Sequence, residues 1–144
     1  MKIRQELLDA IASHGKTGYP YEVCGVLLGR YGEGRVTRVV QLFNREREKP
    51  RVRYHVDAED LLLVMQRYRD EKLDIVGYYH THPDHPPRPS PTDLARAMDT
   101  GGLTDGYFHI VMSIEEGQRA AAPCGWIFRF EAERFDEEPF EIED

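Results

Sequence analysis

The stretch that most restricts the fold of this chain is LDIVGYYH, residues 73–80. It is short and apolar, and its β-branched and aromatic side chains favour a strand over a helix. An apolar strand of this kind lies inside a sheet, where other strands flank it and further elements cover its faces. The rest of the chain must therefore supply neighbouring strands and covering layers.

Several other stretches show strand or helix patterns. Strands are expected at residues 23–29, 35–44, 51–56, 107–114 and 122–130, and the first two read as a hairpin. Helices are expected from the N-terminus to Gly15, after Asp57 and after Ser90. Their apolar faces would carry Ile3, Leu7, Leu8 and Ile11 in the first helix, and Leu61, Val64, Met65 and Tyr68 in the second. This order predicts a single α/β (α+β) domain over residues 1–144, with helices flanking a mixed sheet.

The negative charge of the chain is concentrated at one end. The formal net charge is −7, and residues 131–144 alone carry eight acidic side chains and one arginine, so the first 130 residues are balanced. No net basic surface remains for nonspecific binding to nucleic acid, so a nucleic-acid partner is not expected. We expect the acidic segment to be a solvated edge.

The remaining composition favours a cytoplasmic protein. No apolar run has the length of a membrane span, and the N-terminal residues show a helix pattern rather than a secretory signal. The two cysteines, Cys24 and Cys124, lie in apolar surroundings and are expected to be buried small side chains rather than a disulfide. The sequence does not indicate an oligomeric state.

His80 and His82 end the apolar strand and are two residues apart. Side chains at this spacing on a strand point to the same face, so two imidazoles can reach one metal ion. Zinc is the natural ion for nitrogen ligands completed by one carboxylate, with a fourth position left for water. A pair of histidines alone is weak evidence, because most such pairs are structural or lie on the surface.

The residues that follow the proline-rich loop have two readings. Ser90-Pro91-Thr92-Asp93 has the composition of a helix start, with serine at the N-cap, proline at the first position and an acid at the third. An acid in the first turn also projects from a fixed position toward the preceding loop. Asp93 is therefore a candidate third ligand beside His80 and His82, and both readings can hold together.

A hydrolytic zinc site also needs a base and a hydrogen-bond donor for the developing oxyanion. Ser90 is a candidate donor because it lies beside the candidate ligands in the sequence. Glu22 is a candidate base, since it is a single acid between YPY and the apolar stretch VCGVLLG. Spacing alone does not bring Glu22 to His80, and an exposed loop carboxylate is the alternative.

Together these residues form a specific pattern, H-x-H-P-x6-S-x-x-D, over residues 80–93 with Glu22 upstream. This pattern resembles the JAMM signature of the MPN-domain metalloproteases, and the resemblance covers nearly the whole chain. It implies a cytidine-deaminase-like MPN fold and one zinc ion per chain, held by His80, His82 and Asp93. It also implies that Glu22 is the general base and acid and that Ser90 supports the oxyanion.

The family resemblance further implies a hydrolase that cleaves amide or isopeptide bonds at the C-terminus of ubiquitin-like proteins. The chain has no room for long insertions between its motifs, so it looks like the prokaryotic branch that acts on ubiquitin-like or sulfur-carrier proteins ending in Gly-Gly. The walls of a groove for that tail are expected at residues 23–28 and 84–89. A non-catalytic MPN scaffold, or a RadC-like protein linked to DNA metabolism, is the alternative.

Three further residues lie near this motif or could resemble site residues, but none is expected to take part in the chemistry. His85 lies in the variable spacer of the motif and is expected to be a solvated loop residue. His109 lies in a predicted strand and is expected to be a structural histidine with satisfied hydrogen bonds. Cys24 follows Glu22 by two residues, but a zinc-dependent hydrolysis requires no thiol.

Overall fold

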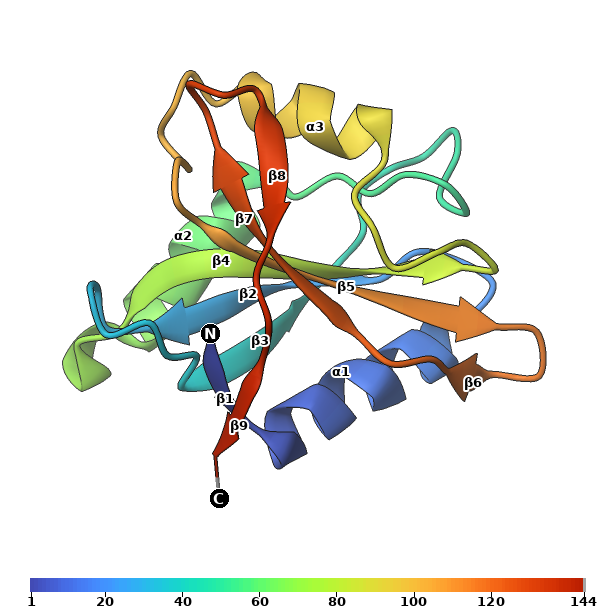
Figure 1. Cartoon of the computed structure of the whole chain (residues 1–144), viewed down its shortest axis with the longest axis horizontal. Helices are drawn as coiled ribbons and strands as arrows, with labels where there is room; N and C mark the ends of the chain where they lie inside the picture. The colour runs from blue at the N-terminus through green and yellow to red at the C-terminus, as the bar shows by residue number, and fades with distance from the viewer. Residues whose placement is uncertain (144) are drawn as a thin grey trace.

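Seven strands form one mixed sheet at the centre of the molecule (Figure 1). The computed structural model describes residues 1–143. The sheet has the order β3-β2-β4-β5-β7-β8, with β6 paired to β5. The strands are β2 (Cys24–Gly29), β3 (Arg38–Leu42), β4 (Asp74–Pro83), β5 (Phe108–Glu115), β6 (Arg119–Ala120), β7 (Cys124–Arg129) and β8 (Arg134–Glu137). Strand β4 pairs with β5 in parallel and the other pairs are antiparallel.

The apolar stretch at residues 73–80 is the central strand β4, as predicted, with β2 on one side and β5 on the other. The strand continues through both histidines to Pro83. The hairpin of β2 and β3 is also confirmed. A separate two-stranded sheet joins β1 (Lys2–Arg4) to β9 (Glu141–Glu143), so part of the acidic segment is an ordered strand.

Helices cover both faces of the main sheet (Figure 1). Helix α1 (Gln5–Gly18) lies on one face, where Leu8 and Ile11 pack with Leu27, Tyr79 and Ile110 in an apolar cluster. Helices α2 (Ala58–Arg67) and α3 (Pro91–Met98) lie on the other face, and a 3-10 turn (Arg69–Glu71) follows α2. A mixed sheet flanked by helices was predicted, and the structure confirms it.

Gly15 lies within α1 and does not end it, contrary to the sequence expectation. A Cβ atom at this position would stand 2.8 Å from Thr81 Cγ2 and 2.9 Å from Ile114 Cδ1. The glycine therefore lets the helix approach the sheet closely, and the helix continues to Gly18. Ile3 is fully buried, but it belongs to β1 rather than to the helix, because it pairs with the distant Ile142.

Two further expectations were wrong. Residues 51–56 form a loop and not a strand. Tyr54 and Val56 of this loop pack against the apolar cluster that Val64 of α2 forms with residues of β2 and β3. Met65 on α2 is 57% exposed, while Leu61 and Tyr68 pack inward as expected. Within residues 1–143, no helix has both the length and the apolar character needed to cross a membrane.

Candidate metal centre

Strand β4 places two imidazoles side by side on the face that α2 and α3 cover. Because side chains alternate along a strand, His80 and His82 share this face while Tyr79 and Thr81 point toward α1. His80 is 1% exposed and His82 is 6% exposed. Their Nε2 atoms lie 3.0 Å apart. Two buried ring nitrogens thus converge on one point.

The start of α3 brings a carboxylate to the same point. Ser90 caps the helix: its Oγ accepts from the Asp93 N–H at 3.1 Å, and Asp93 Oδ2 accepts from the Ser90 N–H at 2.8 Å. This is the capping box expected from the sequence. The same Oδ2 atom lies 3.1 Å from His80 Nε2 and 3.3 Å from His82 Nε2. Asp93 can therefore cap helix α3 and face the two imidazoles as a candidate metal ligand at the same time.

Protonation in this cluster follows from its hydrogen bonds. The His82 Nδ1–H donates to the carbonyl of Pro86 at 2.8 Å, so in a neutral ring His82 Nε2 presents a lone pair. Burial opposes a charge on Asp93, but His80, His82 and the Ser90 N–H together hold the pKa of Asp93 well below its usual range. Burial lowers the pKa of His80. Burial opposes a charge on His82, but its hydrogen bonds to Asp93 and to the Pro86 carbonyl raise the pKa of His82.

These donors fit a small metal ion. Ligands bound to one ion at about 2.0–2.1 Å in a tetrahedron lie about 3.3 Å apart. The three atoms of His80, His82 and Asp93 are 3.0, 3.1 and 3.3 Å from one another. Two imidazoles and a carboxylate are also a ligand type that suits zinc. A cation at this point would accept electron pairs from all three atoms.

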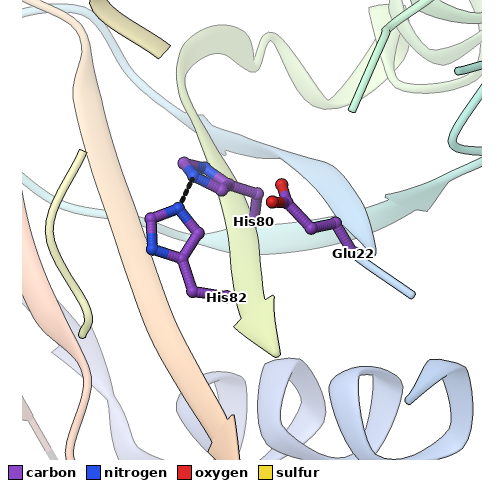
Figure 2. A group of neighbouring side chains, drawn as sticks. All are labelled: Glu22, His80 and His82. Atoms are coloured by element: carbon purple, nitrogen blue, oxygen red, sulfur yellow. Dashed lines mark hydrogen bonds between the residues drawn. The ribbon is translucent and has the colours of Figure 1, made fainter. Parts of the chain in front are cut away.

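Glu22 brings a fourth group to the cluster from the segment before β2. Its carboxylate and the ring nitrogens of His80 and His82 lie within 4.8 Å of one another and form a possible metal-binding group (Figure 2). Glu22 is 4% exposed, and its Oε1 has no hydrogen-bond partner among residues 1–143. Burial raises the pKa of Glu22 to about 8, with His82 opposing and Asp93 adding to the rise. The exposed loop carboxylate considered as an alternative is thus excluded.

Asn44 fixes the backbone around Glu22. Its Nδ2 donates to the carbonyls of Glu22 and Arg53, both at 3.0 Å. Its Oδ1 accepts from the N–H groups of Glu46 at 3.0 Å and His55 at 3.1 Å. Asn44 thus links the Glu22 carbonyl to the loop that contains Glu46, Arg53 and His55. Sequence reasoning missed this residue, because a lone asparagine after a strand carries no distinctive pattern.

The same loop reaches His80 through Tyr54. The Tyr54 ring stacks on the His80 ring, with centroids 4.5 Å apart and planes inclined by 27°. Arg96 of α3 donates to the Tyr54 carbonyl and forms an ion pair with Glu46 at 2.8 Å. The loop is therefore held over the histidines from both ends. Tyr54 and Arg96 were also missed as site residues, since only the fold brings them to His80.

The other candidate residues differ in burial and in hydrogen bonding. Ser90 Oγ accepts one hydrogen bond, which leaves its O–H free to donate. His85 is exposed, as expected. Cys24 is buried and free, and burial raises the pKa of its thiol to about 12, so it is no nucleophile. The expectation of satisfied hydrogen bonds at His109 was wrong: its Nε2 is enclosed and has no hydrogen-bond partner among residues 1–143.

Known proteins share this sequence and fold. Residues 4–126 match the family of prokaryotic homologs of the JAB domain, Prok-JAB. A desampylase from Haloferax volcanii is 34% identical over 133 residues, which cover 90% of this chain and 91% of that protein. The CysO-cysteine peptidase of Mycobacterium tuberculosis is 33% identical over 97 residues, 67% of this chain and 65% of that protein.

A solved JAB1/MPN domain protein from Archaeoglobus fulgidus has the same fold, with a TM-score of 0.59 and 18% identity over all of both chains. The family match covers most of the chain and includes every residue of the candidate centre, from Glu22 to Asp93. This chain belongs to the prokaryotic branch of the JAB (JAMM/MPN) domain family.

Proposed function

We propose that this chain is a zinc-dependent metallopeptidase that hydrolyses the amide or isopeptide bond after the C-terminal Gly-Gly of a small ubiquitin-like or sulfur-carrier protein. One observation carries the proposal: His80, His82 and Asp93 converge to within 3.3 Å, with the buried Glu22 carboxylate beside them. The names of the relatives, a desampylase and a CysO-cysteine peptidase, support this class of substrate.

His80, His82 and Asp93 are the proposed ligands, and Glu22 is left as the proposed acid and base. Bound there, zinc supplies a Lewis acid and makes a water molecule easier to deprotonate. Three protein ligands leave one position open, as in catalytic rather than structural zinc sites. Two of the three proposed ligands are oriented by other groups: Asp93 accepts from the Ser90 N–H, and His82 donates to the Pro86 carbonyl.

Glu22 moves the proton in the proposed reaction. It takes a proton from the attacking water, and it delivers that proton to the leaving nitrogen. The water oxygen adds to the carbonyl carbon and the C–N bond breaks, which gives an amine and a carboxylic acid that then loses its proton to solvent. A base and acid of this kind works best when its pKa lies near the working pH. Burial supplies that shift here, although a nearby cation would lower the pKa of Glu22 again.

Ser90 is the proposed donor to the oxyanion. Its hydroxyl accepts from the Asp93 N–H and keeps its own proton for the substrate oxygen. Ser90 also lines a cavity of about 340 Å³ with Glu22, Val52, His82 and Arg88, which we name the Glu22 cavity. The expected wall at residues 84–89 contributes to it, whereas the strand at residues 23–28 is buried in the sheet.

The first experiment is the zinc content of the purified protein, compared with that of Asp93→Ala. About one zinc per chain, lost in the variant, is the result that supports the ligand set. Cleavage is then measured on carrier proteins joined through Gly-Gly to a lysine or to a free amino acid, with Glu22→Gln as the metal-binding inactive control. A protein that takes up no zinc would contradict the proposal and favour a scaffold, whereas a Glu22→Gln variant with full turnover would rule out Glu22 as the base.

A further inference from the structure

A second cavity reaches the candidate centre from the other end of the histidine pair. It has a volume of about 460 Å³, and we name it the Tyr78 cavity. Its wall includes Tyr54, Val56, Leu61, Tyr78, Ala97 and His109, and it touches the centre through Asp93. Along β4, Tyr78 borders this cavity and His82 borders the Glu22 cavity, with His80 between them. The two cavities therefore lie on opposite sides of His80.

The position of Glu22 indicates which part of a substrate each cavity takes, if the proposed function holds. Glu22 must lie within hydrogen-bond reach of the nitrogen that it protonates, so the leaving group belongs on its side. Glu22 lines the Glu22 cavity and does not line the Tyr78 cavity. The carbonyl side of the bond, which is the tail of the carrier protein, is left for the Tyr78 cavity.

His109 gives this cavity an unused polar group. It pairs with Tyr78 across β4 and β5, is 6% exposed, and packs edge-on against Phe135 with ring centroids 4.9 Å apart. Burial lowers the pKa of His109 to about 3, with His80 adding to the effect and Asp93 opposing it, so the ring is neutral. A neutral imidazole has one donor and one acceptor, and buried groups of this kind normally have partners. The ring borders the cavity, and its Nε2 has no hydrogen-bond partner among residues 1–143.

The size and lining of the cavity indicate the kind of side chain that it accepts. Two glycines have no side chains and would leave a space of about 460 Å³ largely unfilled. The lining is mainly apolar, and the charged groups at its wall are Asp93, Asp99 and Arg96. Arg96 is already paired with Glu46, so no free cation faces an acidic ligand in the part of the chain that the structure describes. A neutral, apolar side chain is the best complement.

We infer that the Tyr78 cavity binds a large apolar side chain of the carrier tail, from the residue just before the terminal Gly-Gly, with His109 hydrogen-bonded to the tail beside it. This inference rests on the proposed function for the direction of the tail. It assigns substrate selection to a cavity that contains none of the proposed catalytic groups. Asp93 is shared by the cavity and the proposed ligand set, so binding of the tail would place its last carbonyl at the centre.

The test is direct binding of short peptides to zinc-loaded Glu22→Gln protein, measured by calorimetry and by NMR. The peptides end in Leu-Gly-Gly, Asp-Gly-Gly or Gly-Gly-Gly. Burial of a leucine side chain predicts about 10- to 100-fold tighter binding of the first peptide. The NMR signals of the Ala97 methyl group and the His109 ring should shift with it, and those of Val52 should not.

Two variants locate the effect. Ala97→Phe fills the cavity and should remove the preference for leucine, and His109→Phe should weaken binding of the leucine peptide about 3- to 10-fold through the lost hydrogen bond. Leu63→Ala, at an exposed position on α2, is the matched control and should keep the preference. Zinc content and melting temperature of each variant show whether it is folded.

The outcomes separate the two proposals. Equal affinity for the leucine and aspartate peptides, no binding of any peptide, or signal shifts confined to the Glu22 cavity would overturn the inference, even if the wild type cleaves carrier conjugates. If the leucine peptide binds in the Tyr78 cavity but the wild type cleaves no conjugate, the inference about this cavity stands and the proposed hydrolysis fails.

Discussion

The two faces of the central sheet differ in how completely their buried groups are satisfied. On the α1 face, Ile3, Ile11, Ile110 and Ile114 are fully buried and apolar. The polar atom of Tyr79 there bonds to His14 Nδ1 at 2.7 Å. On the α2 and α3 face lie all three enclosed side-chain atoms without a partner in residues 1–143, in Glu22, His80 and His109. The α2 and α3 face also carries an apolar cluster around Val64, but it differs from the α1 face in leaving these enclosed polar atoms unpaired.

Neighbouring residues of a single strand belong to different faces of the sheet. Tyr79 and His80 are neighbours on β4, yet one packs against α1 and the other belongs to the candidate centre. The same holds on β5, where His109 faces the Tyr78 cavity and Ile110 lies in the α1 core. Because side chains alternate along a strand, a residue packed in the apolar core can be the immediate neighbour of a residue in the candidate centre. Substitutions on the two faces should have different consequences.

The largest effect is expected from the proposed ligands. Asp93→Ala and His82→Ala should each reduce zinc content from about one per chain to near zero and remove turnover. Asp93→Ala should also lose about 0.5–2 kcal/mol of stability through its helix cap, while His82→Ala should not lose that term. Elemental analysis and chemical unfolding check both points. Full zinc content in either variant would show that the ligand is another residue.

A large but more selective effect is expected at Glu22. Glu22→Gln keeps the shape of the side chain and removes its ability to carry a proton, so turnover should fall about 10²- to 10⁴-fold. Zinc content should be unchanged, which distinguishes a base from a ligand. Steady-state kinetics with metal analysis decide the matter, and a variant that loses zinc as well would place Glu22 in the ligand set instead.

On the opposite face, Ile110→Ala should affect stability rather than chemistry. Ile110 is 0% exposed in the α1 core, and removal of its side chain should cost about 2–5 kcal/mol of unfolding free energy. Zinc content and turnover of the folded fraction should stay close to wild type at low temperature. A selective loss of zinc from folded Ile110→Ala would mean that the two faces are not separable.

Unfolding of the metal-free protein should show how much the buried Glu22 carboxyl group lowers stability as the pH rises. Burial raises the pKa of Glu22 from 4.5 to about 8, so the folded state holds a proton that the unfolded state releases. Stability should therefore fall as pH rises from about 4.5 to about 8, by up to about 1.4 kcal/mol per pH unit, and then level off. Glu22→Gln lacks this term. Unfolding of chelated wild type and variant at pH 5.5, 7 and 8.5 tests this, and parallel curves would contradict it.

The smallest effect is expected at Asn44, which acts through the backbone of Glu22. Asn44→Asp keeps the acceptor for Glu46 and His55 and removes the donor to the Glu22 and Arg53 carbonyls. We expect kcat to fall about 10-fold with zinc content unchanged, because the hydrogen bond that fixes the Glu22 backbone is lost together with the bond to Arg53. An unchanged kcat would show that the covering loop positions Glu22 without Asn44.

Much of the fold, and the placement of His80, His82 and Asp93 in one candidate cluster, could be predicted from the sequence for local reasons. The strand at residues 73–80 and the box at Ser90 and Asp93 follow from side-chain period and helix capping, which depend on neighbours in the chain. Glu22 depended on the family resemblance, since only the pairing of β2 with β4 brings it to His80.

The features that could not be predicted depend on contacts between distant residues. Ile3 forms a strand because its partner is Ile142, and residues 51–56 form a loop because Asn44 and Arg96 bind its backbone. His109 was expected to be satisfied, as most buried histidines are. Its exception follows from a cavity that exists only between folded elements. Sequence patterns report local geometry, whereas unfilled space arises from the packing of the whole chain.

The capping box of α3 has a consequence for how the site opens. The same Asp93 oxygen that faces the imidazoles also accepts from the Ser90 N–H, and the Asp93 N–H is held by Ser90 Oγ. Loss of the proposed ligand and fraying of the first helical turn are thus one local unfolding event. Amide hydrogen exchange at Asp93 would slow on metal binding, and the residence time of the ion would be limited by the lifetime of a helix cap.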